Sequence, residues 1–177
     1  SHLHPQPQTE ENRMLRYDFE DSLGYWVFSV AHLMTRAMND ELGKLGITYR
    51  QWEVLCWLSY MGEITQSELA DQMRIEAPTL VGVIDRMERD GWIVRETDPN
   101  DRRKKIIRAT EKVEPMWEQM VDCAKSVRAK ALRDVPPEDV QKVKSTLTVI
   151  RGNLLSELPG HNIPAEPVGQ KQPTETR

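Results

Sequence analysis

The sequence predicts a mostly α-helical fold of the α+β class, in which helices accompany one small β-hairpin. Three observations lead to this prediction. Apolar residues recur at the spacing of amphipathic helices along most of the 177 residues. Capping patterns mark the starts of several helices. One pair of strand-like segments flanks Asp-Pro-Asn-Asp at 98–101, a run of turn-forming residues.

The two ends of the chain differ in composition from its middle. Residues 1–13 and 159–177 are polar, contain prolines and lack hydrophobic periodicity, so we expect disordered tails. Residues 14–158 have the usual size of a single domain. The pattern divides this domain into a lobe at about 48–112 and long terminal helices at about 18–45 and 113–158.

The overall composition is ordinary for a globular protein, with 38% hydrophobic residues and a net charge of −4. No run of about 18 apolar residues is present to span a membrane, and the polar N-terminal stretch argues against secretion, so we expect a cytoplasmic location. Cys56 and Cys123 lie in apolar, helix-like surroundings, which predicts two buried, reduced thiols. A redox sensor is the alternative, and it needs an exposed thiol of lowered pKa.

The first long helix, at about 18–45, is predicted from an apolar stripe that faces away from polar positions. The stripe consists of Leu23, Trp26, Val27, Val30, Leu33, Met34, Ala37 and Leu42. A capping box of Thr48 and Gln51 opens a second helix, which runs to about Met61 and is stopped by Gly62. Ile64 is expected to form a single short strand.

Two further helices and the hairpin follow. Thr65 and Glu68 form a capping box for a short third helix that ends near Met73. A fourth helix is expected over 77–90, because Pro78 fits its first turn and Gly91 terminates it. The hairpin strands are predicted at 92–97 and 104–109.

The last two helices complete the terminal region. The stripe of the first includes Val113, Met120 and Val127, and Pro136-Pro137 opens the second. The apolar residues of the final helix recur at spacings of 3, 4, 3 and 4: Val140, Val143, Leu147, Ile150 and Leu154. Such a narrow seam suits packing against another helix. With apolar helices at both ends of the chain, we expect a homodimer.

Residues 102–108 read RRKKIIR, which places five cations in seven positions of an acidic chain. A helix-turn-helix followed by a basic hairpin is the arrangement of a winged helix-turn-helix, which suits binding to DNA. The second helix enters the major groove, and the hairpin reaches over phosphates or into the minor groove. We therefore predict a protein that binds double-stranded DNA. The alternatives are a generic helical pair with a solvated basic loop, and an adaptor that uses the same fold to bind protein without DNA.

The stretch from Thr65 to Lys112 resembles the DNA-binding lobe of the MarR family of winged-helix regulators. The SlyA-like branch is most similar, through IEAPTLV at 75–81, DPNDRRKKI at 98–106 and TEKVEP at 110–115. The resemblance covers about 18–158. It implies an obligate homodimer of triangular α/β shape, with DNA-binding lobes that move when a small ligand binds. We therefore expect a transcription regulator that acts as a repressor.

Pattern and resemblance together give a set of candidate DNA-binding residues. They are Ser67, Ala77, Thr79, Leu80, Gly82, Arg86, Arg102, Arg103, Lys104 and Lys105. Asp85 and Asp101 are expected to orient the wing arginines Arg102 and Arg103 through charge-assisted bonds. Gly82 replaces an arginine of the SlyA-like pattern, so a guanine-reading side chain is absent there. A two-fold dimer predicts an inverted-repeat operator with half-sites about 10 bp apart.

An effector of the aromatic carboxylate or phenol class is implied by the resemblance. Trp26, His32, Arg36 and Trp52 are the candidate ligand-binding residues, since His32 and Arg36 are one helical turn apart and suit an anion, and the two tryptophans suit apolar walls. The alternative is that His32 and Arg36 are simply solvated. The sequence has no Cys/His metal spacing, phosphate-binding glycine loop or nucleophile motif, so we expect neither an enzyme nor a cofactor.

Overall fold

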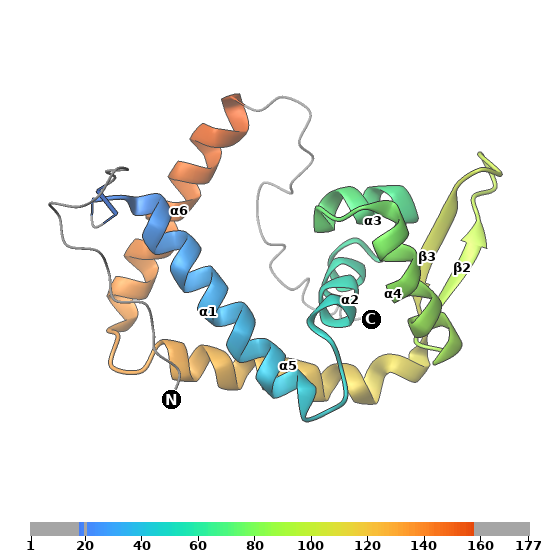
Figure 1. The fold of residues 1–177 in the computed structure, drawn as a ribbon, viewed down its shortest axis with the longest axis horizontal. Coiled ribbons are helices and arrows are strands. Elements are labelled where there is room, and N and C mark those ends of the chain that lie inside the picture. The colour runs from blue at the N-terminus through green and yellow to red at the C-terminus, as the bar shows by residue number, and fades with distance from the viewer. Residues whose placement is uncertain (1–17, 20, 158–177) are drawn as a thin grey trace, which may run out of the picture.

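The computed structural model describes residues 18, 19 and 21–157, and it confirms the mostly helical fold with one small sheet (Figure 1). The predicted tails at 1–13 and 159–177 lie outside the described residues. The elements are α1 (Leu23–Gly43), α2 (Tyr49–Met61), β1 (Glu63–Thr65), α3 (Gln66–Met73), α4 (Ala77–Arg89), β2 (Ile93–Thr97), β3 (Lys105–Ala109), a 3-10 turn (Glu111–Val113), α5 (Glu114–Ala131) and α6 (Pro137–Glu157).

The starts of the helices follow from local capping. Both predicted capping boxes form: the backbone N–H of Gln51 donates to the Thr48 hydroxyl at 3.2 Å, and that of Glu68 donates to the Thr65 hydroxyl at 3.3 Å. Helix α1 begins at Leu23 and not near residue 18, because the Ser22 hydroxyl accepts the N–H of Tyr25 and caps the helix there.

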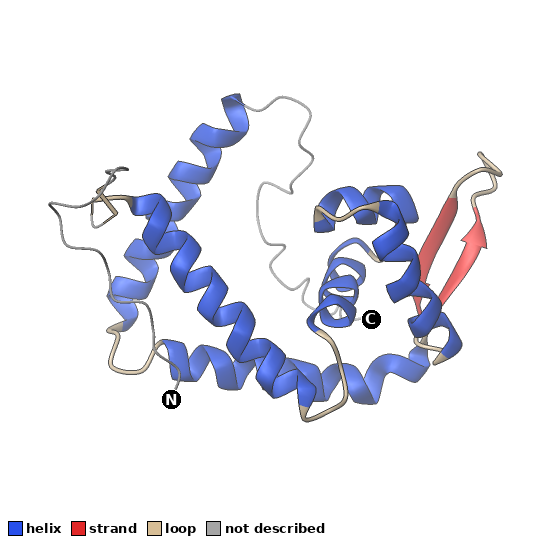
Figure 2. Ribbon diagram, viewed as in Figure 1, coloured by secondary structure: helices blue, strands red, loops and turns tan. Residues whose placement is uncertain are grey.

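The sheet has the antiparallel order β1-β3-β2, so β3 is central and β2 is an edge strand. Figure 2 shows the hairpin of β2 and β3 in red. Ile64 of β1 pairs with Ile107 of β3, and Ile93 of β2 pairs with Ala109. Ile64, Ile93 and Ile107 are all buried, which assigns one face of the sheet to the core. Each hairpin strand is one residue shorter at its start than predicted.

Helix α4 is amphipathic, and its inner stripe joins the core. Leu80, Val83, Ile84 and Met87 are buried at helical spacing. The helix ends at Arg89, and Gly91 follows with φ of 76°, a left-handed conformation that glycine adopts without a steric penalty. This stop turns the chain directly into β2.

Helix α5 connects the two halves of the molecule. In Figure 1 it runs along the base, with the lobe of α2–α4 and the sheet at one end and α6 at the other. Helix α1 packs along α5. Glu41 of α1 accepts a hydrogen bond from Lys130 of α5, and this contact, with a smaller contribution from Lys44, lowers the pKa of Glu41 to about 2. The rings of Trp52 in α2 and Trp117 in α5 stack with centroids 5.1 Å apart and tie the lobe to this base.

The apolar stripes of the terminal helices are mostly uncovered in the single chain. Of helix α1 only Met38 and Leu42 are buried, and α6 has no buried residue. Large apolar side chains are exposed on both helices, namely Leu23, Trp26, Val27, Phe28, Val30, Leu33 and Met34 on α1 and Val143, Leu147, Val149 and Leu154 on α6. None of the described helices combines the length and apolarity that crossing a bilayer requires.

Candidate nucleic-acid interface

The outward face of α4 presents small and hydrogen-bonding side chains. Ala77, Thr79 and Arg86 are exposed, and Gly82 is half-exposed between them. A Cβ built on Gly82 would meet no atom within 4 Å, so neither packing nor a left-handed backbone requires glycine at this position. The face is therefore open to a partner.

One predicted contact residue on α4 is wrong. Leu80 is 0% exposed and belongs to the buried stripe of the helix, so its side chain packs in the core and does not face DNA. Ser67, predicted on α3, is exposed in the first turn of that helix, where its hydroxyl lies 3.4 Å from that of Thr65.

The tip of the hairpin is held by short-range hydrogen bonds that its acidic side chains accept. The N–H of Asn100 donates to Asp98, and the N–H of Arg103 donates to Asp101 at 3.1 Å. The Arg103 guanidinium also pairs with Asp101 at 3.2 Å, and this contact lowers the pKa of Asp101. The lowered pKa favours the ionised form of Asp101, which lies beside Arg103.

The five cations of the basic block do not behave alike. Within the described part of the chain, Arg102 has no ion-pair or hydrogen-bond partner, and it is exposed. Lys104 is exposed, and Lys105 donates to the Thr97 hydroxyl at 2.8 Å. Arg108 bridges two carboxylates from the neighbouring strands, Glu63 at 2.7 Å and Glu96 at 2.9 Å. The free positive charge is thus concentrated at the tip.

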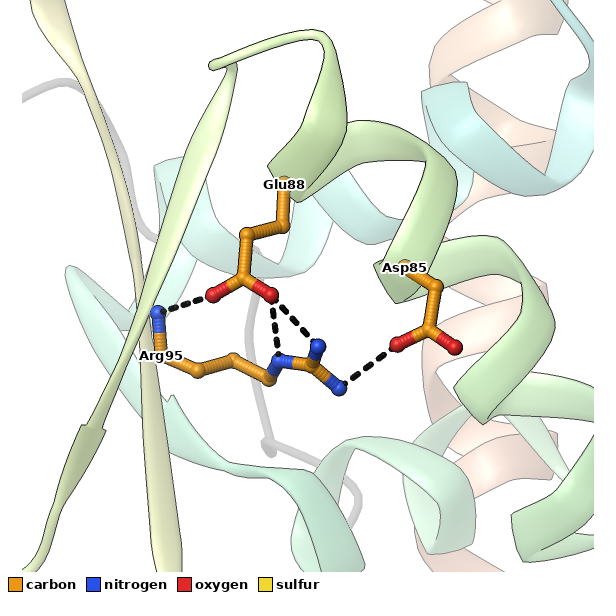
Figure 3. Close-up of polar contacts among 3 residues, drawn as sticks. All are labelled: Asp85, Glu88 and Arg95. Carbon is orange, nitrogen blue, oxygen red and sulfur yellow. Dashed lines mark hydrogen bonds and ion pairs between the residues drawn. The ribbon is translucent and has the colours of Figure 1, made fainter.

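A cluster of three charged residues joins the hairpin to α4, and sequence reasoning missed it (Figure 3). Arg95 of β2 forms an ion pair with Asp85 at 2.8 Å and donates from Nε to Glu88 at 3.0 Å. Its Nη2 also donates to Glu88. The prediction that Asp85 orients Arg102 or Arg103 is corrected accordingly: its partner is Arg95, because the strand carries that guanidinium over the helix.

The four candidate ligand residues are not gathered in one place within the chain. Trp26 and Arg36 are ten residues apart on α1, which is about 15 Å along a helix axis. Both are exposed, and the exposed His32 ring stacks on Phe28. Trp52 is half-buried against Trp117. A common pocket would need a further surface to complete it.

The two cysteines are free and half-buried. Burial raises the pKa of the Cys56 thiol to about 12, which disfavours the reactive thiolate that a redox sensor needs. Among the residues that the structure describes, no three His, Cys, Asp or Glu side chains are placed to hold a metal ion.

Comparison with known proteins finds similar sequences for the lobe. Residues 47–105 match the model of the MarR family. The uncharacterised HTH-type transcriptional regulator YwoH of Bacillus subtilis is 33% identical over 90 residues, which are 51% of this chain and 65% of YwoH. The matched stretch is therefore slightly under two thirds of that relative.

Solved structures extend the likeness beyond the lobe. Wild-type MarR from E. coli, in its apo form, is 25% identical with a TM-score of 0.67, covering 73% of this chain and 96% of MarR. CouR from Rhodococcus jostii RHA1, bound to p-coumaroyl-CoA, is 26% identical with a TM-score of 0.63, covering 76% and 95%. The likeness to the MarR family therefore covers residues 47–105 of the sequence, and the fold of the described chain is similar to that of MarR and CouR.

Proposed function

We propose that this protein regulates transcription, as a repressor, by binding double-stranded DNA with α4 in the major groove and the hairpin as a wing. One observation carries the proposal: α4 exposes Thr79, Gly82 and Arg86, and the tip of the following hairpin carries Arg102, which pairs with no described residue. A mutant MarR of E. coli, similar in fold with a TM-score of 0.63, is complexed with operator DNA. The closer likeness to the SlyA-like branch is part of this proposal and rests on the IEAPTLV and DPNDRRKKI segments.

The functional unit that we propose is a homodimer. The lobe at about 48–112 would bind DNA, and the terminal helices at about 18–45 and 113–158 would hold two copies together. Exposed apolar residues on α1 and α6 support this assignment, since Phe28 is 72% and Val149 is 64% exposed in the single chain. Contiguous apolar surface of this kind marks an interaction site.

We propose further that a small aromatic or phenolic ligand modulates the affinity for DNA. CouR, which shares the fold, is bound to p-coumaroyl-CoA, whose p-coumaroyl group is a phenol. In the dimer, the second copy would supply the surface that Trp26, His32, Arg36 and Trp52 lack for a common pocket.

The test of DNA binding begins with selection of duplexes by the full protein from a pool with a randomised centre. We expect an inverted repeat with half-sites about 10 bp apart. Titration of the selected duplex at several salt concentrations should show affinity that falls steeply with salt, because each neutralised phosphate releases counterions. Affinity without salt dependence would favour the adaptor alternative, and full affinity for a single asymmetric half-site would contradict the dimer.

Gly82→Ala is expected to raise stability and to weaken DNA binding at the same time. Alanine favours a helix interior over glycine by about 1 kcal/mol, which corresponds to a rise in Tm of about 2–4 °C for a chain of this size. Its methyl group occupies the open space through which the helix backbone approaches DNA. We expect about tenfold weaker binding of the selected duplex, measured by fluorescence anisotropy.

Gly43→Ala is the matched control, because Gly43 also lies in a helix and its Cβ would meet nothing within 4 Å. This variant should leave DNA affinity unchanged. If Gly82→Ala stabilises the protein and binds DNA as tightly as wild type, close approach at Gly82 is excluded.

A further inference from the structure

Strand β2 carries one side of the wing but has a strand neighbour on one edge only, since the sheet order is β1-β3-β2. On its open edge, the backbone N–H of Arg95 donates to the Glu88 carboxylate at 3.3 Å. The position of β2 relative to α4 therefore depends partly on polar contacts, in addition to the burial of Ile93 at its start.

The side chain of Arg95 completes this attachment (Figure 3). Asp85 and Glu88 are three residues apart on α4, so their carboxylates lie on neighbouring positions of one helix face. The guanidinium reaches both, with Nη1 2.8 Å from Asp85 and Nε 3.0 Å from Glu88. A planar guanidinium held at several nitrogens has a fixed orientation, which a single flexible contact does not give.

The charged groups of Arg95, Asp85 and Glu88 pair with one another. The side chain of Arg95 is 25% exposed, and the hydrogen bond from Arg95 lowers the pKa of Glu88, which keeps that carboxylate ionised. Arg95 is thus neutralised by two anions and is not a free phosphate contact. The same helix presents Thr79, Gly82 and Arg86 outward.

We propose that Arg95 is a positioning residue that fixes the angle of the wing on the recognition helix, so that Arg102 reaches DNA when α4 lies in the groove. This inference rests on the proposed DNA binding. The contact spans the two elements proposed to meet DNA, and it lies on the outer edge of β2, where no described strand pairs.

The decisive variant removes the two carboxylates, Asp85→Asn with Glu88→Gln. Simple electrostatics predicts tighter DNA binding, because two negative charges are lost near a polyanion. Loss of wing position predicts the opposite. We expect five- to tenfold weaker binding of the duplex selected by wild type, measured by anisotropy at fixed salt.

The matched control is Glu63→Gln with Glu96→Gln. It removes the same two charges from another arginine of the same sheet, since Glu63 and Glu96 hold Arg108. This control should bind as tightly as wild type or more tightly. Thermal unfolding of both double variants checks that they are folded at the assay temperature, and Glu88→Gln alone serves if the Asp85 and Glu88 variant is not.

A double-mutant cycle with Arg102→Ala separates positioning from a local effect. In the Arg102→Ala background, removal of the two carboxylates should cause no further loss of affinity. Binding that equals or exceeds that of wild type in the carboxylate variant overturns the proposal, and so does a full loss that persists without Arg102. Failure of wild type to select any duplex would instead reject the proposed function.

Discussion

Leu147→Glu on α6 is expected to convert the protein into a monomer and to weaken DNA binding at least a hundredfold. Leu147 lies in the middle of the apolar seam of α6, and no residue of that helix is fully buried by the described chain. In the proposed dimer, the new carboxylate would be buried without a partner, which costs several kcal/mol. Sedimentation equilibrium and titration of the selected duplex measure the two effects.

The loss of affinity should be large because each half-site holds its lobe only weakly. Linking two lobes makes the second contact intramolecular and raises affinity by about 10²–10⁴-fold. Ser145→Glu is the control: it adds the same charge about 180° around α6 from the seam, where the residue is exposed. A Leu147→Glu protein that remains dimeric, or a chain truncated at Pro136 that stays folded, dimeric and bound to DNA, would contradict this assembly.

The sequence predicts helix boundaries well where the determining contacts are local. The hydroxyls of Thr48 and Thr65 cap helices through residues only three positions ahead, so the pattern of side chains contains the whole interaction. The predicted start of α1 near residue 18 is too early. Ser22 caps this helix, but Tyr25 lies three residues on, where a capping box has Glu or Gln, so the local pattern does not mark the start.

The candidate site was predicted less well, because it depends on distances between elements. Leu80 fits the buried stripe of α4 by its spacing from Val83 and Met87, and that periodicity is a better guide than its position near the start of the helix. The partner of Asp85 needs the angle between the hairpin and α4, which no local pattern contains. The alternation of β2 gives one usable signal: Arg95 lies two residues after the buried Ile93, so it shares the face toward the helices.

Arg102→Ala is expected to weaken DNA binding by about 1–3 kcal/mol at fixed moderate salt, the usual scale for one well-placed arginine. Arg102 is exposed, and no described residue pairs with its guanidinium. Arg103→Ala should have a smaller effect, since Arg103 already pairs with Asp101 and must exchange that contact for phosphate. Lys104 or Lys105 would add a phosphate contact. Titrations of each variant against the selected duplex provide the comparison.

Operators with different flanks distinguish two possible contacts of Arg102, the minor groove and the phosphate backbone. A narrow A·T-rich minor groove concentrates negative potential. If Arg102 inserts into that groove, Arg102→Ala should reduce the affinity for DNA more on A·T-rich flanks than on G·C-rich flanks. If Arg102 contacts only phosphate, Arg102→Ala should reduce the affinity equally on both flanks. The slope of log affinity against log salt concentration should then fall by about one. Two duplexes that differ only in flank composition, titrated at several salt concentrations, distinguish these modes.

Arg50→Ala removes an equal charge from the exposed start of α2 and should leave both affinities near those of wild type. Wild-type affinity in both Arg102→Ala and Arg103→Ala, with dimeric and folded protein, would remove these two arginines from the mechanism. Lys104 and Lys105 would then be the remaining candidates in the block, because Glu63 and Glu96 already balance the charge of Arg108.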